Sequence, residues 1–206
     1  ASMTLREKLE LAELLQEMTV DICEAGFAAS SEGDFQCVSQ IAELCKDMSI
    51  CTLARSTLTD IARADEALRK AKNPRVPTFI STRPVHMKHN LRMGPNAVLE
   101  AIGSSVTHSR KFVGDVEWSA EDATRTEFDF LCKAIEVAIH SGATVINVPD
   151  TVGYSHPAEY GELIRRLIEN IPDSDKVIWS THCHNDLGLA VANSLAGVIN
   201  GARQVE

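Results

Sequence analysis

The sequence predicts an α/β protein, an incomplete (β/α)8 barrel of the TIM type, from three observations. Segments with the apolar spacing of amphipathic helices alternate with short β-rich segments along all 206 residues. Successive strand-like segments lie roughly 30 residues apart, the size of one βα unit. Polar side chains follow the carboxyl ends of several of these strands. Repeated βα units without a linker predict one parallel sheet and a single domain, residues 1–206.

The helices are predicted from apolar stripes and end signals. In 4–18, Leu5, Leu9, Ala12 and Leu15 share one helical face, and Thr4 with Glu7 has the spacing of a capping box. Further segments with helical periodicity are 31–46, 59–71, 95–111, 127–140, 157–170 and 187–200. Residues 83–94 are predicted to form a long loop before the fourth of these helices.

The strands are predicted from β-rich runs between the helices. They are 20–25, 49–54, 75–81, 115–119, 144–148 and 176–181, and 203–206 opens another. Pro77 should leave one position of the third strand without a backbone donor. A closed barrel has eight strands, whereas six strands and the opening of another are predicted here. We therefore expect a barrel whose first strand is missing and whose last strand is truncated.

A closed barrel is favoured over an open doubly wound sheet by the polar residues at the strand ends. We place seven of them there, namely Glu24, Arg55, Thr82, Glu117, Glu121, Asp150 and His184. The active site of a barrel is assembled at that face from several strands at once. A dinucleotide-binding sheet would carry GxGxxG after its first strand, and the sequence has none.

Composition excludes several classes of protein. Apolar residues make up 44% of the chain, which excludes disorder, and no long uncharged apolar run predicts a membrane span. The net charge of −9 argues against a nucleic-acid partner. The chain opens without the pattern of a secretory leader, and its six cysteines lie scattered without a CxxC pair. We therefore expect reduced thiols and a cytoplasmic protein.

His182 and His184 form the clearest candidate for a metal site. They lie two residues apart at a strand end, so both imidazoles project to one side of the sheet. Facing a barrel interior, they can grip one divalent cation, and imidazole suits Zn, Mn, Fe or Co. The alternative is a pair of hydrogen-bonded histidines on a polar strand end. Cys183 should point to the opposite face.

Three further segments carry candidate residues. Glu117 and Ser119 share one strand face, and Glu121 follows in a loop. A carboxylate in the mouth of a barrel is either functional or paired with a cation such as Arg125. At a Pro-Asp-Thr turn, Thr151 offers its hydroxyl to an anion, whereas Asp150 fits a helix or turn cap. In the 83–94 loop, His86 is a candidate acid, base or substrate contact, or else an exposed histidine.

Longer motifs resemble one family, the 2-isopropylmalate synthases, within the metal-dependent (β/α)8 Claisen-condensing enzymes and aldol-cleaving lyases. They are EAGF at 24–27, TLAR at 52–55, TFIST at 78–82, HMKH at 86–89, VEWSAEDATRT at 116–126, GATVINVPDTVGY at 142–154, STHCHNDLGLAVANSLAG at 180–197 and GARQVE at 201–206. The resemblance covers essentially the whole chain. Homocitrate synthases resemble it too, but typically carry NDTG where this sequence has NDLG at 185–188, and citramalate synthase is a closer rival.

The resemblance implies a metal-dependent acyltransferase that condenses acetyl-CoA with 3-methyl-2-oxobutanoate, giving 2-isopropylmalate and CoA in leucine biosynthesis. By the family pattern, His182 and His184 ligate a divalent metal, Mg or Mn and sometimes Zn. Thr151 hydrogen-bonds the oxo-acid carboxylate, and Glu121 faces acetyl-CoA. The pocket for the branched side chain is lined by His86, Ser119 and Leu53. Family members are commonly dimers, so the resemblance also implies a homodimer, with small-molecule substrates as the other partners.

The sequence departs from the family pattern in several places. The family's DTTLRDGEQ motif, with a metal-binding Asp and a catalytic Arg, has no match in 1–18, and the motif after 201–206 and the regulatory domain are absent. Ala28 stands where Pro is usual, Thr19 and Thr124 where Gly is usual, and Arg83 where Ser is usual. We therefore expect a fragment that is inactive alone, or, as the alternative, a non-catalytic barrel module that dimerises through its edges.

Overall fold

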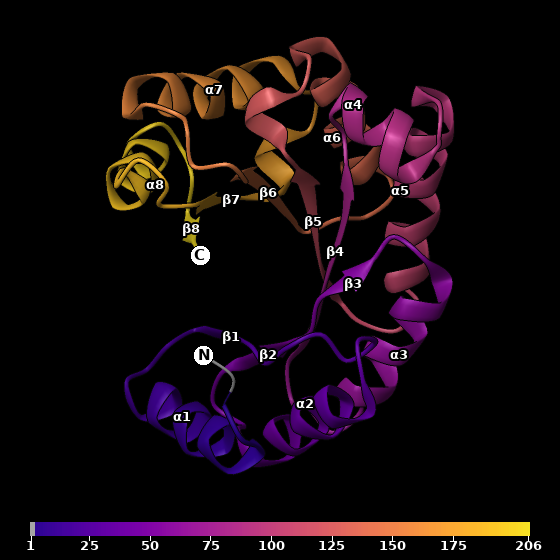
Figure 1. Cartoon of the computed structure of the whole chain (residues 1–206), viewed down its shortest axis with the longest axis vertical. Coiled ribbons are helices and arrows are strands. Elements are labelled where there is room, and N and C mark those ends of the chain that lie inside the picture. The colour runs from indigo at the N-terminus through magenta and orange to yellow at the C-terminus, as the bar shows by residue number, and fades with distance from the viewer. Residues whose placement is uncertain (1–2) are drawn as a thin grey trace. The chain divides into compact units, whose positions relative to one another are not determined.

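The computed structural model describes residues 3–206 as alternating helices and parallel strands in two compact units (Figure 1). Unit 1 contains residues 3–78 and 108–116, and unit 2 contains residues 79–107 and 117–206. The division falls within three elements, β4 (Pro74–Ser81), α5 (Pro95–Ser109) and β5 (Asp115–Glu121). The sequence did not predict this division, because periodicity shows where elements lie and not how densely they pack.

In unit 1 the strands β1 (Ile22–Glu24), β2 (Ser49–Cys51) and the beginning of β4 pair in parallel, and β3 (Ala54–Arg55) pairs with β4. The helices that follow the strands in sequence pack beside them. The helices of this unit are α1 (Leu5–Glu17), α2 (Glu32–Leu44) and α3 (Leu58–Leu68). Val38, Ile41 and Ala42 of α2 are buried, which agrees with the helical periodicity of residues 31–46.

Side chains cap these helices where the sequence indicated. The Thr4 hydroxyl accepts the N–H of Glu7, and the Glu7 carboxylate accepts the N–H of Thr4, which completes the predicted capping box. Ser31 and Thr57 cap α2 and α3 in the same way. Each cap accepts an N–H that has no partner inside the helix, which fixes the point where the helix begins.

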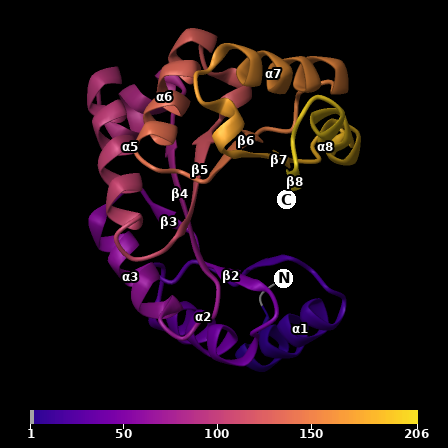
Figure 2. The ribbon, with the colours of Figure 1, turned by 180° about the vertical axis from the view of Figure 1, so that it is seen from behind.

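In unit 2 the end of β4 is followed in order by β5, β6 (Val145–Asp150), β7 (Ile178–Cys183) and β8 (Gln204–Val205). Their helices are α4 (Pro84–His86), α5, α6 (Phe128–His140), α7 (Pro157–Asn170) and α8 (Ala190–Ile199). Figure 2 shows α5 and α6 on the outer side of β4 and β5. Trp118, Ile146 and Val148 of the strands are fully buried, as is Ile164 of α7. The core of unit 2 thus lies between its sheet and its helices.

Gly197 shows why a small residue is needed where α8 crosses β7. A Cβ at this position would collide with the methyl of Thr181 and come within 3.2 Å of the Tyr160 ring. The absent side chain lets α8 approach β7, the strand that carries His182.

The structure confirms the predicted order of helices and strands, except that the expected strand 49–54 is divided into β2 and β3, and it corrects three further details. Residues 83–94 are not an open loop, because α4 and a π-helical turn, Met87–Leu91, fill most of the segment. Strands β5, β6 and β7 each end two residues later than expected. Glu117 therefore lies inside β5 and not at its end, where it is buried and accepts a hydrogen bond from Gln204.

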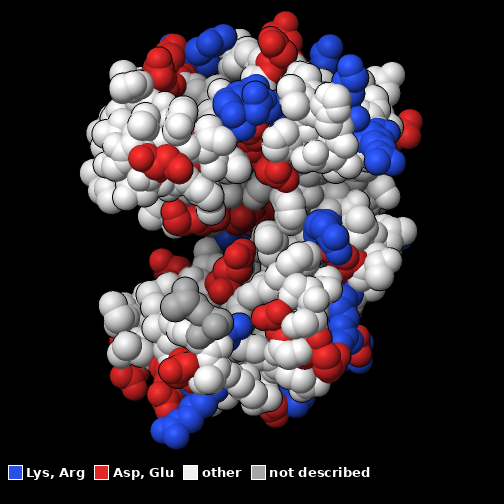
Figure 3. Space-filling view, viewed as in Figure 1, with Lys and Arg blue, Asp and Glu red and all other residues white. Residues whose placement is uncertain are grey.

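All six cysteines are free, and four of them are buried, which agrees with the prediction of small core thiols. Among residues 3–206, no helix has both the length and the apolar character needed to cross a membrane. Lys and Arg side chains lie in small separate groups among acidic and uncharged ones on the face seen in Figure 3.

Candidate functional site

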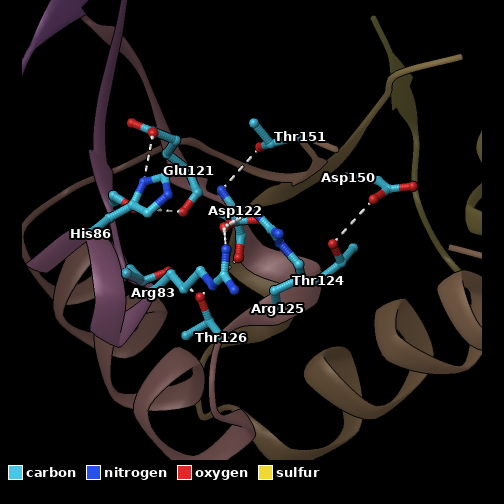
Figure 4. Close-up of polar contacts among 11 residues, drawn as sticks. Arg83, His86, Glu121, Asp122, Thr124, Arg125, Thr126, Asp150 and Thr151 are labelled. Carbon is cyan, nitrogen blue, oxygen red and sulfur yellow. Dashed lines mark hydrogen bonds and ion pairs between the residues drawn. The ribbon is translucent and has the colours of Figure 1, made fainter. Parts of the chain in front are cut away.

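The carboxyl ends of β4, β5 and β6 bring together the candidate residues of unit 2 that Figure 4 shows. His86, from α4, approaches Glu121, the last residue of β5, with 3.5 Å between Nδ1 and a carboxylate oxygen. Both side chains are about one quarter to one third exposed. His86 is therefore neither fully solvated nor buried, and its imidazole lies beside a carboxylate.

Asp122 occupies the centre of this cluster. It is fully buried, and its carboxylate accepts two hydrogen bonds of 2.7 Å from the guanidinium of Arg125. The hydrogen bond to Asp122 raises the pKa of Arg125 above its ordinary value. A second guanidinium, from Arg83, lies 3.5 Å from the same carboxylate. The charge of Arg83, the residue that stands where Ser is usual in the family, is therefore partly compensated by a buried acid.

Thr151 follows β6 and is linked to Asp122. The backbone N–H of Asp122 donates to the Thr151 hydroxyl over 3.0 Å, and this hydroxyl lies on a half-buried side chain. The neighbouring Asp150 is fully buried and accepts hydrogen bonds from the Thr124 hydroxyl and from the N–H of Ser155. Asp150 thus holds the turn together, as predicted, and the half-buried Thr151 stays the candidate ligand contact of this turn.

His182 and His184 converge at the end of β7. Their Nε2 atoms lie 3.1 Å apart, so both rings project to one side, as the spacing predicted. At this distance the two rings share a hydrogen bond, as the alternative interpretation expected. Cys183 between them faces α7 and α8, where burial raises the pKa of its thiol and Ser194 and Tyr160 interact with it. The ring of His182 also lies near Glu206, with 3.6 Å between Nδ1 and a carboxylate oxygen.

A polar network inside the sheet was not foreseen from the sequence. Asn147 of β6 donates to the hydroxyl of Ser119 and to the carboxylate of Glu206, which also accepts from Ser180. Burial raises the pKa of Glu206, but hydrogen bonds, the strongest from His182, outweigh it and lower the pKa overall. Ser119, Asn147 and Ser180 each interrupt an apolar run of a predicted strand. This alternation of polar and apolar residues was the sequence signal that could have indicated the network.

The structure places six of the seven predicted site residues in unit 2 and brings them together in two groups. His86, Glu121 and Thr151 belong to the group of Figure 4. Ser119, His182 and His184 lie along the network of β5 to β8. Leu53, which follows β2, belongs to unit 1 and is half-buried there. Asp122 and Asn147 are the residues that the sequence analysis missed.

Solved structures of low sequence identity share this fold. Hydroxymethylglutaryl-CoA lyase from Pseudomonas aeruginosa aligns with a TM-score of 0.80 at 16% identity, covering 100% of this chain and 69% of that one. The carboxyl transferase domain of Rhizobium etli pyruvate carboxylase aligns over 98% of this chain and 36% of that chain, with a TM-score of 0.73 and 16% identity. The predicted fold class is confirmed, since the chain matches an incomplete (β/α)8 barrel.

Curated relatives match at much higher identity. The chain is 64% identical over 206 residues to a 2-isopropylmalate synthase of Caulobacter vibrioides (strain NA1000 / CB15N), and 56% identical to that of Bradyrhizobium sp. (strain ORS 278). The alignments cover 100% of this chain and 39% of each relative, so the chain spans about two fifths of their length. A family model described as HMGL-like matches residues 1–206. Because this model matches the whole chain, the chain belongs to the HMGL-like family.

Proposed function

We propose that this chain is the barrel portion of a 2-isopropylmalate synthase, which condenses acetyl-CoA with 3-methyl-2-oxobutanoate to give 2-isopropylmalate and CoA. The observation that carries the proposal is the convergence of the two imidazoles, with 3.1 Å between their Nε2 atoms. Identities of 54–64% to 2-isopropylmalate synthases over the whole chain support the choice of substrates. The enzyme is an acyltransferase that converts the acyl group to an alkyl group on transfer.

The two histidines fit two positions of a divalent metal site. Two nitrogens about 2.1 Å from one cation, at a right angle to each other, lie about 3 Å apart. Glu206 beside Nδ1 of His182 favours the tautomer with a lone pair on Nε2, which a cation could bind in place of the hydrogen bond to His184. Among residues 3–206 no three His, Cys, Asp or Glu side chains are placed to hold a metal together. We propose Mg or Mn, with Zn as a further option, and a carboxylate ligand from the family's DTTLRDGEQ motif.

A divalent cation at His182 and His184 would polarise the keto oxygen and stabilise the alkoxide that forms during condensation. The chain's own residues bind and orient the partners. The hydroxyl of Thr151 donates to the oxo-acid carboxylate, and Ser119 and His86 of the same unit line the pocket for the branched side chain. Holding both substrates in a fixed orientation lowers the entropic part of the activation barrier.

Glu121 faces acetyl-CoA and has His86 as its neighbour at 3.5 Å. A base must take a proton from the thioester methyl before the new C–C bond forms, and both a carboxylate and a neutral imidazole can accept one. We propose Glu121 and His86 as the catalytic pair. The pair acts at the same strand ends as Thr151, so both substrates meet there.

The proposal includes a setting for the enzyme. The substrates are small molecules, with neither nucleic acid nor a membrane as partner, and we propose a homodimer in the cytoplasm. The relatives named above are the basis for the small-molecule substrates. Sedimentation velocity of the protein in its full encoded length tests the dimer, and a single species of monomer mass would contradict it.

The activity is tested by following CoA release with a thiol reagent, using the protein in its full encoded length, Mn and a panel of oxo acids. We expect 3-methyl-2-oxobutanoate to have the highest kcat/KM. His182→Ala should lower kcat and the affinity for Mn measured by electron paramagnetic resonance. His140→Ala, on an exposed residue of α6, is the matched control and should change neither. Preference for pyruvate would assign a citramalate synthase, preference for 2-oxoglutarate a homocitrate synthase, and no release with any acid a non-catalytic module.

A further inference from the structure

Asp122 has a backbone conformation that few residues adopt. Its φ is +64° and its ψ is +39°, the left-handed region that non-glycine residues occupy uncommonly. Asp is among the residues that tolerate this region best. It directly follows Glu121, so the chain turns sharply between the proposed catalytic carboxylate and the short 3-10 helix Ala123–Arg125.

Hydrogen bonds from Arg125 and Thr126 help to hold the turn in place. The guanidinium of Arg125 donates twice to the Asp122 carboxylate, each bond 2.7 Å long, and Thr126 donates its hydroxyl to the Asp122 carbonyl over 2.9 Å. The carboxylate is fully buried. A strained conformation persists where the surroundings over-determine it, and they tend to do so at functional sites.

The turn aims the N–H of Asp122 at the hydroxyl of Thr151, 3.0 Å away (Figure 4). A threonine hydroxyl has one proton to donate and two lone pairs to accept. The bond from Asp122 occupies a lone pair, so the hydroxyl proton remains available to a second group. An anionic acceptor, such as a carboxylate, is the partner that such a donor binds most strongly.

We propose that Asp122 is a positioning residue, which orients the Thr151 hydroxyl toward the carboxylate of the oxo acid. This rests on the proposed function, in which Thr151 binds that carboxylate. Since Asp122 also follows Glu121 directly, the same turn fixes the spacing between the two substrate-facing residues. Arg125 acts one step further away, by holding the Asp122 carboxylate.

The test is a double-mutant cycle on the protein in its full encoded length, with steady-state kinetics for both substrates. Thr151→Val removes the hydrogen bond from the hydroxyl to the oxo-acid carboxylate, so it should raise the KM for the oxo acid about tenfold or more. Asp122→Ala should raise this KM by a similar factor. The KM for acetyl-CoA should change less than about threefold in both variants. In the double variant, Asp122→Ala should add less than about twofold to the effect of Thr151→Val, because it acts through that hydroxyl.

Two further variants separate positioning from folding. Asp122→Asn tolerates the left-handed conformation and keeps an acceptor for Arg125, so it should raise the KM for the oxo acid only about threefold. It replaces Asp122→Ala in the cycle if the latter does not fold. Asp173→Ala is the matched control, because Asp173 also has a positive φ, of +60°, and pairs with Lys176 elsewhere in unit 2. It should leave both KM values unchanged.

Multiplicative effects of the two substitutions in the double variant would overturn the positioning role and leave the function intact. An unchanged KM for the oxo acid in Thr151→Val would instead remove Thr151 from the proposed substrate site, and the inference about Asp122 with it. Equal losses for both substrates in Asp122→Ala, with no loss in Asp122→Asn, would show that the residue serves the fold alone.

Discussion

The carboxylate of Asp60 in unit 1 shows how one buried charge is accommodated. It lies in the first turn of α3 with a side chain that is 7% exposed, and Arg55 donates to both of its oxygens, over 2.7 and 3.1 Å. Burial raises the pKa of Asp60, but hydrogen bonds from Arg55 and Thr57 outweigh burial, and the pKa is lowered overall. The folded state therefore favours the ionised form.

Asp60→Asn should lower the free energy of unfolding at pH 7 by about 1–3 kcal/mol, because Arg55 loses its charged partner. The folded pKa is below the unfolded value of about 3.9, so the contribution of Asp60 is present above that pH and is lost as the pH falls through the folded pKa. The difference between the two proteins should therefore shrink below about pH 4. Urea unfolding followed by circular dichroism at pH 7 and pH 3 measures it.

Asp65→Asn, on the same helix, is the control and should cost much less at pH 7. A difference between wild type and Asp60→Asn that stays constant or grows toward pH 3 would contradict the assignment of the lowered pKa to the Arg55 pair.

Single residues were partly predictable from the sequence. Thr151, His182 and His184 follow from strand ends and spacing, and the caps Thr4 and Ser31 follow from local chemistry. Asp122 was missed, because an acidic residue in a loop gives no sign of burial. The only sequence signal was Arg125 three residues later, whose guanidinium donates two hydrogen bonds to the Asp122 carboxylate.

At the scale of elements, α1 ends in a way that explains one departure from the family pattern. The N–H of Thr19 donates to the carbonyl of Gln16, and the N–H of Val20 donates to that of Leu15, which together form a Schellman motif. Thr19 has a φ of +60° in this motif. That position favours glycine, and a β-branched residue there is strained.

Thr19→Gly should therefore raise the free energy of unfolding by about 1 kcal/mol, because the left-handed conformation costs L-residues roughly this amount. Thr19→Val keeps the branched Cβ and should bring no gain. Thermal unfolding followed by circular dichroism compares the three proteins. A lower midpoint for Thr19→Gly than for the parent would show that flexibility of the glycine in the unfolded chain dominates.

The segment 83–94 shows the limit of prediction by element. Its polar composition indicated a loop, yet Pro84 begins α4 and the chain continues through the π-helical turn to Arg92, which has a φ of +54°. Proline at the first helical position was an available start signal. Met87, the first residue of the turn, is buried, and a local sequence pattern does not reveal either this burial or the π-helical hydrogen bonding.

For the whole molecule, the alternation of elements was enough to predict the parallel sheet and its class of fold. Each βα unit buries its helix against its own strands, so the periodicity of the sequence carries the topology. The boundary between the two units was not predictable, because it crosses β4, α5 and β5 and follows no change in composition.

We expect the 206 residues alone to release CoA at least about 100-fold more slowly than the protein in its full encoded length. The reason is that the resemblance places a metal-binding Asp and a catalytic Arg in the DTTLRDGEQ motif, which has no match among these residues. The chain covers 39% of its curated relatives. The thiol assay with Mn, acetyl-CoA and 3-methyl-2-oxobutanoate measures both samples side by side. Equal turnover would show that residues 1–206 contain all the groups that catalysis needs.

Both tryptophans of the sequence, Trp118 and Trp179, lie in unit 2, and both are buried. Intrinsic fluorescence excited at the indole band is therefore an optical probe of that unit alone, whereas circular dichroism averages over the helices of both. Recording the two signals along one denaturation series would reveal sequential melting of the units without adding any label.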